Sequence, residues 1–163
     1  KNTDFSFLSG YDLEKNFEHI ILGSINFHQT NVEMEKVSFK NIFSEDAINI
    51  ISSDFLLENG VFNEISSDAI DIDYGKGIVN NLEMKNILND AIDFSESNAN
   101  ISNIFFGNIG DKAISAGENS KIEIDNLKIS DSYLGITSKD GSDVNAKNIK
   151  ISSVWVISSD YVA

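Results

Sequence analysis

The chain of 163 residues has no cysteine and no proline. Without cysteine it can form no disulfide, offer no thiolate to a metal and use no cysteine nucleophile. Proline removes a backbone donor from a β-ladder, so its absence suits a chain made mostly of hydrogen-bonded strands. These absences favour a fold held together by packing and backbone pairing alone.

Positive charge is scarce. There are 26 acidic residues against 12 basic ones, every basic residue is lysine, and the formal net charge is −14. A negative field of this size repels phosphate backbones and anionic membrane surfaces, so we expect no nucleic-acid partner. It repels acidic sugars too, unless divalent cations bridge them.

Long apolar runs are also missing. None approaches the roughly 20 residues that span a bilayer, and the start lacks the basic-then-apolar pattern of a signal peptide. We therefore expect no membrane span. Because the chain opens with Lys1 rather than Met, we expect it to be a piece of a longer protein.

A block of about 22 residues repeats along most of the chain. The sequence DAINI at 46–50 returns as DAIDI at 68–72, as DAIDF at 90–94 and more loosely as KAISA at 112–116. A fixed period in this range is typical of a solenoid, in which each repeat buries its apolar face only by stacking on its neighbours.

Superposing the repeats gives four columns of like residues at steps of 22 or 23. The first is the Ala-Ile pair of each block, continued by Gly135-Ile136 and by Val156-Ile157. The second is Phe17, Phe39, Phe62, Met84, Phe106, Ile129 and Ile151. The third is Leu82, Ile104, Leu127 and Ile149. The fourth is Asn59, Asn81, Asn103, Asn126 and Asn148.

Within each repeat, apolar and polar residues alternate in short stretches such as Ile122-Glu-Ile124. This period of two predicts strands with one buried face, and helical spacing is not sustained through the repeats. Three strands per repeat describe one coil of a parallel β-helix with coils about 4.8 Å apart. We predict an all-β, single-domain solenoid of about six to seven coils, with the asparagines hydrogen-bonding the corner backbone and one another.

The two ends depart from the repeat. We assign residues 1–24 to an irregular coil or cap and residues 25–163 to the solenoid. Phe5-Ser6-Phe7 suits an early strand, and Tyr11 to Ile21 suits either an irregular coil or an amphipathic capping helix. The segment from Trp155 to Ala163 begins another coil and stops, as if a further domain followed.

The asparagine column, the aromatic stack and the 22-residue coils resemble right-handed parallel β-helices of the pectate-lyase-like superfamily. The right hand is what this resemblance implies, and it agrees with the general preference for right-handed parallel crossovers. The segments at 110–120 and 135–142 are similar to β-helix regions of bacterial surface proteins, some of which carry a kinase-like domain related to spore coat protein H. The resemblance implies an extracellular or cell-surface location.

An acidic cluster is the first candidate site. Asp68, Asp71 and Asp73 on one coil stand beside Asp90 and Asp93 on the next. Stacked carboxylates repel unless one is protonated or a cation lies between them, so calcium or acid-base chemistry fits this cluster. The alternative is that these side chains are simply the solvated outer face of an acidic protein.

Other candidates lie further along the chain. The inverted pairs Asp111-Lys112 and Lys139-Asp140 either hold a ligand or stabilise corners. The aromatics Tyr133 and Trp155, 22 residues apart, either form a platform that stacks on a sugar or flank the core. The acidic series Glu96, Glu118 and Asp140 is typical of turn chemistry.

Catalytic parts known from this superfamily are missing. Its pectate lyases use an arginine base, and its polygalacturonases use Gly-His-Gly and Arg-x-Lys elements; the chain has none of these. We therefore expect a non-catalytic extracellular scaffold with a binding face for carbohydrate or a partner domain, and no cofactor other than calcium. The alternative is a polysaccharide lyase or hydrolase that uses Asp71, Asp73 and Asp93 with a bound cation.

Overall fold

The structure, a computed structural model, describes residues 2–9 and 23–156. These residues form β-strands and no helix, so none of them forms a helix able to cross a membrane. The strands are β1 (Thr3–Ser6), β2 (Gly23–His28), β3 (Val32–Glu35), β4 (Val37–Ile42), β5 (Asp46–Ile51), β6 (Asp54–Ile65), β7 (Asp68–Asp73), β8 (Lys76–Ile87), β9 (Ile92–Ser95), β10 (Asn98–Gly117), β11 (Lys121–Ser138) and β12 (Asp143–Val156).

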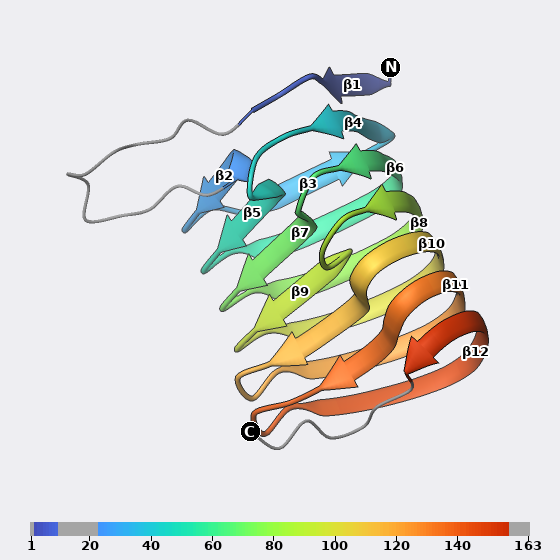
Figure 1. Cartoon of the computed structure of the whole chain (residues 1–163). Coiled ribbons are helices and arrows are strands. Elements are labelled where there is room, and N and C mark those ends of the chain that lie inside the picture. The colour runs from blue at the N-terminus through green and yellow to red at the C-terminus, as the bar shows by residue number, and fades with distance from the viewer. Residues whose placement is uncertain (1, 10–22, 157–163) are drawn as a thin grey trace, which may run out of the picture.

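All strand pairs are parallel and join one continuous sheet that winds into a solenoid of about six turns (Figure 1). Each long strand contributes more than one side of a coil. The first part of β10 pairs with β8 and its last part with β9, while its whole length pairs with β11. The predicted all-β parallel β-helix is thus confirmed, and its right hand stays a prediction.

The predicted core columns are confirmed in their register. Phe39, Phe62, Met84, Phe106, Ile129 and Ile151 follow one another as strand partners. The first four of these side chains are essentially inaccessible to solvent, and the rings of Phe39 and Phe62 stack with centroids 4.9 Å apart. Apolar side chains at a fixed step therefore build one continuous core along the axis.

Two predicted positions in these columns were wrong. The place before Phe39 belongs to Phe5, which is its strand partner and stacks on it at 4.7 Å. The prediction had used Phe17, one period earlier, whereas Phe5 lies 34 positions before Phe39. At the other end Val156 pairs with Leu134, so it does not align with Gly135.

Several predictions concern residues that lie outside the described part of the chain. These are Phe17, the coil or capping helix proposed for Tyr11 to Ile21, and the segment 157–163. Strand β1 lies within the predicted cap at 1–24, and β2 begins at its end. Because β1 pairs with β4 and β2 pairs with β5, both strands belong to the solenoid sheet.

The corners have a cause that the sequence analysis missed. Each coil bends at residues whose φ is positive, between 48° and 60° among the corner residues below. The first corner uses Lys36, Asn59, Asn81, Asn103, Asn126 and Asn148. The second uses Asn41, Glu64, Asn86, Asn108, Asp131 and Ser153. The third uses Gln29, Ser52, Tyr74, Glu96, Glu118 and Asp140.

This conformation explains why short polar residues recur at the corners. The left-handed region costs most L-residues roughly 1–2 kcal/mol, and asparagine adopts it more readily than most because its side chain hydrogen-bonds locally. The asparagine column therefore marks a backbone requirement as well as a ladder. The same requirement accounts for Glu96, Glu118 and Asp140, which confirms their interpretation as turn residues.

Glycine is required where strands approach closely. Gly77 is the strand partner of Phe55, and a Cβ atom on it would lie 2.0 Å from the Phe55 carbonyl oxygen and 2.6 Å from its ring. The aromatic ring of one coil thus occupies the side-chain space of the next. A larger residue at 77 would separate the two coils.

Corner strain gives a first prediction. Glu64 is an exposed corner residue with φ of 60°, in a column where asparagine occurs three times. Glu64→Asn should raise the free energy of unfolding by about 0.5–1 kcal/mol, because asparagine tolerates this φ better. Chemical denaturation measures the change.

The matched control is Glu123→Asn, which removes the same charge from an exposed strand residue of β11. We expect no stabilisation from it. An equal gain in both variants would show that lower net charge, and not relief of corner strain, is responsible.

Candidate functional site

The predicted acidic cluster divides into two columns that run from β5 through β7 and β9 to β10 and β11. The corner column contains Asp46, Asp68, Asp90 and Lys112. The strand column contains Asn49, Asp71, Asp93, Ser115 and Thr137, each the strand partner of the next. The predicted stacking of Asp71 on Asp93 is confirmed, whereas Asp73 is the partner of Ser95.

In the corner column the carboxylates of Asp68 and Asp90 each bind the backbone of the next coil. Asp68 Oδ1 accepts hydrogen bonds from the Asp90 amide at 2.8 Å and from Asn89 Nδ2 at 2.6 Å. Asp90 Oδ1 accepts one from the Lys112 amide at 2.9 Å, and Lys112 Nζ lies 3.3 Å from both of its oxygens. These bonds tie successive corners together and occupy the carboxylates.

The strand column is desolvated, and its Asp71 carboxyl holds a proton. Asn49 Nδ2 donates to Asp46 Oδ2 at 3.1 Å and to Asp71 Oδ2 at 3.0 Å. Burial, followed by repulsion from the carboxylates of Asp46, Asp73, Asp93 and Asp68, raises the pKa of Asp71 to about 8. Burial likewise raises the pKa of Asp46 to about 7. Asp71 is therefore largely protonated at neutral pH.

Four buried oxygens of the strand column have no hydrogen-bond partner: Asn49 Oδ1, Asp93 Oδ1, Ser115 Oγ and Thr137 Oγ1. Ordered water or a bound ion commonly satisfies buried oxygens of this kind. Residues 2–9 and 23–156 contain no group of three His, Cys, Asp or Glu arranged to hold a metal ion. Calcium at Asp68, Asp71, Asp73, Asp90 and Asp93 thus stays a prediction from the sequence.

The two inverted ion pairs do not form one site. Lys112 Nζ is bonded to both Asp111 and Asp90, and its side chain is only 18% exposed. Lys112 is the strand partner of Leu134, at the start of the last segment of β11. Lys139 follows the end of that segment, and its aliphatic chain lies against Gly117. Asp140 is a corner residue. The structure thus separates the two pairs: Lys112 is held by acidic side chains, and Asp140 makes a turn.

Tyr133 and Trp155 are brought together. Their flanking residues pair across β11 and β12, which places the two aromatics on adjacent coils, 53% and 85% exposed. They line a hollow of about 730 Å³ together with Asn108, Gly110 and Asp131 among others. Gly110 cannot carry a side chain, because a Cβ atom would lie 2.1 Å from the Leu88 carbonyl oxygen.

The same outer position carries a large apolar residue on two earlier coils, which the sequence analysis missed. The residues that follow the register series Ile42, Ile65, Ile87, Ile109, Ser132 and Val154 form what we call the apolar column. Its members are Phe43, Ser66, Leu88, Gly110, Tyr133 and Trp155. Phe43 and Leu88 are also largely exposed. The detectable signal was an apolar residue directly after the inward isoleucine.

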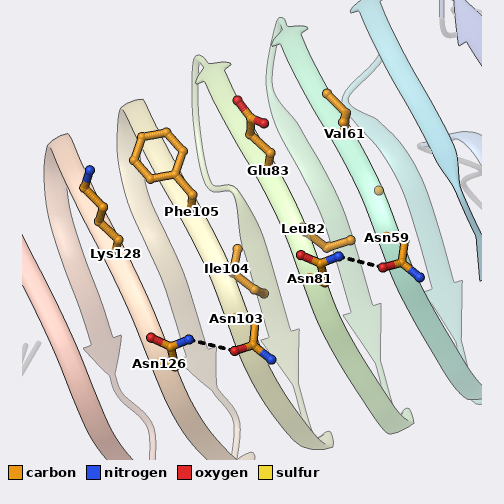
Figure 2. A pocket seen from close by; sticks show the side chains of 11 residues that line it. Asn59, Val61, Asn81, Leu82, Glu83, Asn103, Ile104, Phe105, Asn126 and Lys128 are labelled. Atoms are coloured by element: carbon orange, nitrogen blue, oxygen red, sulfur yellow. Dashed lines mark hydrogen bonds between the residues drawn. The ribbon is translucent and has the colours of Figure 1, made fainter.

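A second hollow, the asparagine groove, lies along the first corner. It has a volume of about 490 Å³, and its lining alternates between the corner asparagines and an outward row on the following strand segments (Figure 2). The lining residues are Asn59, Gly60, Val61, Asn81, Leu82, Glu83, Asn103, Ile104, Phe105, Asn126 and Lys128.

The predicted asparagine ladder is confirmed, with differences in its partners. Asn81 Nδ2 donates to Asn59 Oδ1 at 2.6 Å and Asn126 Nδ2 to Asn103 Oδ1 at 2.7 Å. Asn103, however, donates to Asn80 at 2.8 Å. Asn148 likewise departs from the ladder and donates to Asp125 at 2.8 Å. All five side chains are exposed, so the ladder forms an outer surface and does not fill the core.

No family model matches the chain, and no curated protein matches it significantly. The resemblance to the pectate-lyase-like superfamily and to proteins with spore-coat-type kinase domains therefore remains an interpretation of the sequence. The fold and the three outer surfaces described above are the basis for any functional argument.

The raised pKa of Asp71 gives a prediction about pH. Its folded pKa of about 8 lies above its ordinary value of 3.8, so the folded form binds the proton more tightly. This group's stabilisation is fully present below pH ~4 and is lost as pH rises through 8. Asp71→Asn keeps an acceptor for Asn49 and should raise the melting midpoint by about 3 °C or more at pH 8.5, and by less at pH 5.

Asp143→Asn, at the exposed start of β12, removes one negative charge away from the cluster and serves as the control. We expect it to shift the midpoint little and equally at both pH values. A pH-independent effect of Asp71→Asn, measured by thermal unfolding, would contradict the assignment of a proton to this carboxyl.

Proposed function

We propose that the chain is a non-catalytic, rigid solenoid module that binds carbohydrate on its apolar column, with Tyr133 and Trp155 as the stacking platform. The observation that carries this proposal is the exposure of two large aromatic side chains on adjacent coils beside an open hollow. Exposed aromatics grouped in this way mark interaction surfaces, whereas single exposed apolar side chains are common on any protein surface.

The chemistry of the hollow supports a sugar over a purely apolar ligand. Asn108 and Asp131 line it beside the aromatic rings and offer amide and carboxylate groups to hydroxyls. A sugar ring presents C–H faces to an aromatic surface and hydroxyls at its edge, so both parts of the hollow have a counterpart. The net charge of −14 favours an uncharged sugar over a uronate.

The solenoid supplies rigidity. Every coil of the described sheet is hydrogen-bonded to its neighbours along parallel registers, so the members of the apolar column are held at strand spacing, about 4.8 Å per coil. A surface that is already ordered loses little conformational freedom on binding. We place this module outside the cell or on its surface, as its resemblance to bacterial surface proteins suggests.

A second candidate function is a polysaccharide lyase or hydrolase. The observation in its favour is Asp71, a protonated carboxyl at neutral pH, beside Asp93, whose Oδ1 has no partner. A paired acid and carboxylate is what glycoside cleavage uses. Against it stand the lack of arginine and the engagement of Asp71 and Asp46 with Asn49.

The binding proposal predicts that Trp155→Ala and Tyr133→Ala each weaken binding of uncharged oligosaccharides at least about tenfold, the equivalent of about 1.4 kcal/mol. Isothermal titration with neutral and uronic-acid oligosaccharides measures this. Tyr74→Ala is the matched control, because Tyr74 is 58% exposed at the third corner and outside the apolar column. Equal loss in all three variants, or no binding at all, would refute the proposal.

The same panel separates the enzyme from the binding module. Incubation with each glycan should release no shorter product under the non-catalytic proposal, with or without calcium. Turnover that disappears in Asp71→Asn or Asp93→Asn would establish the second candidate instead.

A further inference from the structure

We propose that the asparagine groove is a second ligand site, for the edge of an uncharged, extended polyhydroxylated chain such as a neutral glycan lying along the solenoid axis. The groove crosses four successive coils at the first corner (Figure 2). It is lined by residues of other strand segments than those of the Tyr133 and Trp155 hollow, so the two sites share no residue.

The backbone alone does not account for the uniform chemistry of this groove. All three corners require a positive φ, and the second and third meet it with Glu64, Asp131, Ser52 and Tyr74 among others. The first corner uses asparagine on five successive coils, from Asn59 to Asn148. Since other residue types meet the same backbone requirement at the second and third corners, the repeated asparagine at the first corner indicates a role for its side-chain amide.

The amides retain capacity to bind. A side-chain amide has two N–H donors and two acceptor lone pairs, and each ladder bond uses one donor of one residue and one lone pair of another. Asn81 and Asn126 each spend one N–H on the preceding coil and keep the other. The ladder thereby holds free donors and acceptors in fixed orientations at the strand spacing, which lowers the entropic cost of binding.

Balanced donors and acceptors fit hydroxyls. A hydroxyl both donates and accepts hydrogen bonds, so a row of amides can pair with a row of hydroxyls and leave no donor or acceptor unpaired. An ion would use only half of this capacity. Because the coils repeat at about 4.8 Å, close to the length of one sugar ring, successive rings can meet successive amides.

The opposite side of the groove combines the apolar side chains of Val61 and Phe105 with the charged side chains of Glu83 and Lys128. Val61 and Phe105 lie in the outward row beside the asparagines (Figure 2). The ammonium groups of Lys85 and Lys128 each lie 5.1 Å from the centre of the Phe105 ring and hold it in place. Lys85 also pairs with Glu83, so a chain of net charge −14 presents little charge here.

Amides on one side of the groove match the hydroxyls at the edge of a sugar ring, and Val61 and Phe105 on the other side match the C–H bonds on its face. Groove and ligand would then run parallel to the axis. This inference does not depend on the proposed function of the apolar column, and either site can fail while the other holds.

The experiment uses the variant Asn81→Gly/Asn103→Gly, since glycine keeps the positive φ and removes only the amides. The matched control is Asn41→Gly/Asn86→Gly at the second corner, where φ is 54° at both positions and Asn86 makes an equivalent ladder bond to Asn63. Neutral oligosaccharides of two to six units and uronic-acid oligosaccharides are titrated against the wild type, both variants and Trp155→Ala.

We expect the affinity of the wild type for neutral oligosaccharides to rise with length up to about four units, the number of coils that the groove crosses. The groove variant should lose at least about tenfold in affinity for the longer ligands, while the control and Trp155→Ala retain this length dependence. The inference is overturned if no neutral glycan binds, if uronates bind more tightly, if length has no effect, or if both double variants lose affinity equally.

Discussion

The fold depends on one backbone constraint: each coil must turn three times and return to the same register above its predecessor. Residues with positive φ make these turns at every coil, and parallel hydrogen bonds hold the result. The intervals between equivalent corners are 22 or 23 residues, so an extra residue is absorbed without loss of register. Inward side chains then stack into one core, and outward side chains are compelled to stack as well.

This stacking of outward side chains has favourable and unfavourable consequences, depending on the residue type. Where outward rows are amides or aromatics, stacking creates extended surfaces with fixed spacing, as in the asparagine groove and the apolar column. Where the row is aspartate, stacking forces carboxylates together, and the chain responds with protonation at Asp71 and with the ion pair between Asp90 and Lys112. One geometrical rule therefore accounts for a candidate binding face and for a pH-sensitive cluster.

The sequence was sufficient for the core but not for the surface. Phe39, Phe62 and Met84 could be aligned because burial selects apolar residues at a fixed step. Phe5 was missed because its separation of 34 positions from Phe39 exceeds one period, so a periodic alignment selected Phe17. The asparagines were identified, yet their exposure and positive φ could not be, since both depend on how the chain bends in three dimensions. The high pKa of Asp71 depends on burial by neighbouring coils, which no local pattern reveals.

Register is the central claim, and the absence of cysteine makes it directly testable. Val61 and Glu83 are outward strand partners on β6 and β8, so their Cα atoms lie at the parallel strand spacing of about 4.8 Å, within the range that a disulfide bridges. The double variant Val61→Cys/Glu83→Cys should oxidise to an intramolecular disulfide, detected by mass spectrometry. The variant Val61→Cys/Lys85→Cys, offset by two residues, should not. Equal oxidation of both pairs, or preference for the offset pair, would contradict the stacked register on which the whole account rests.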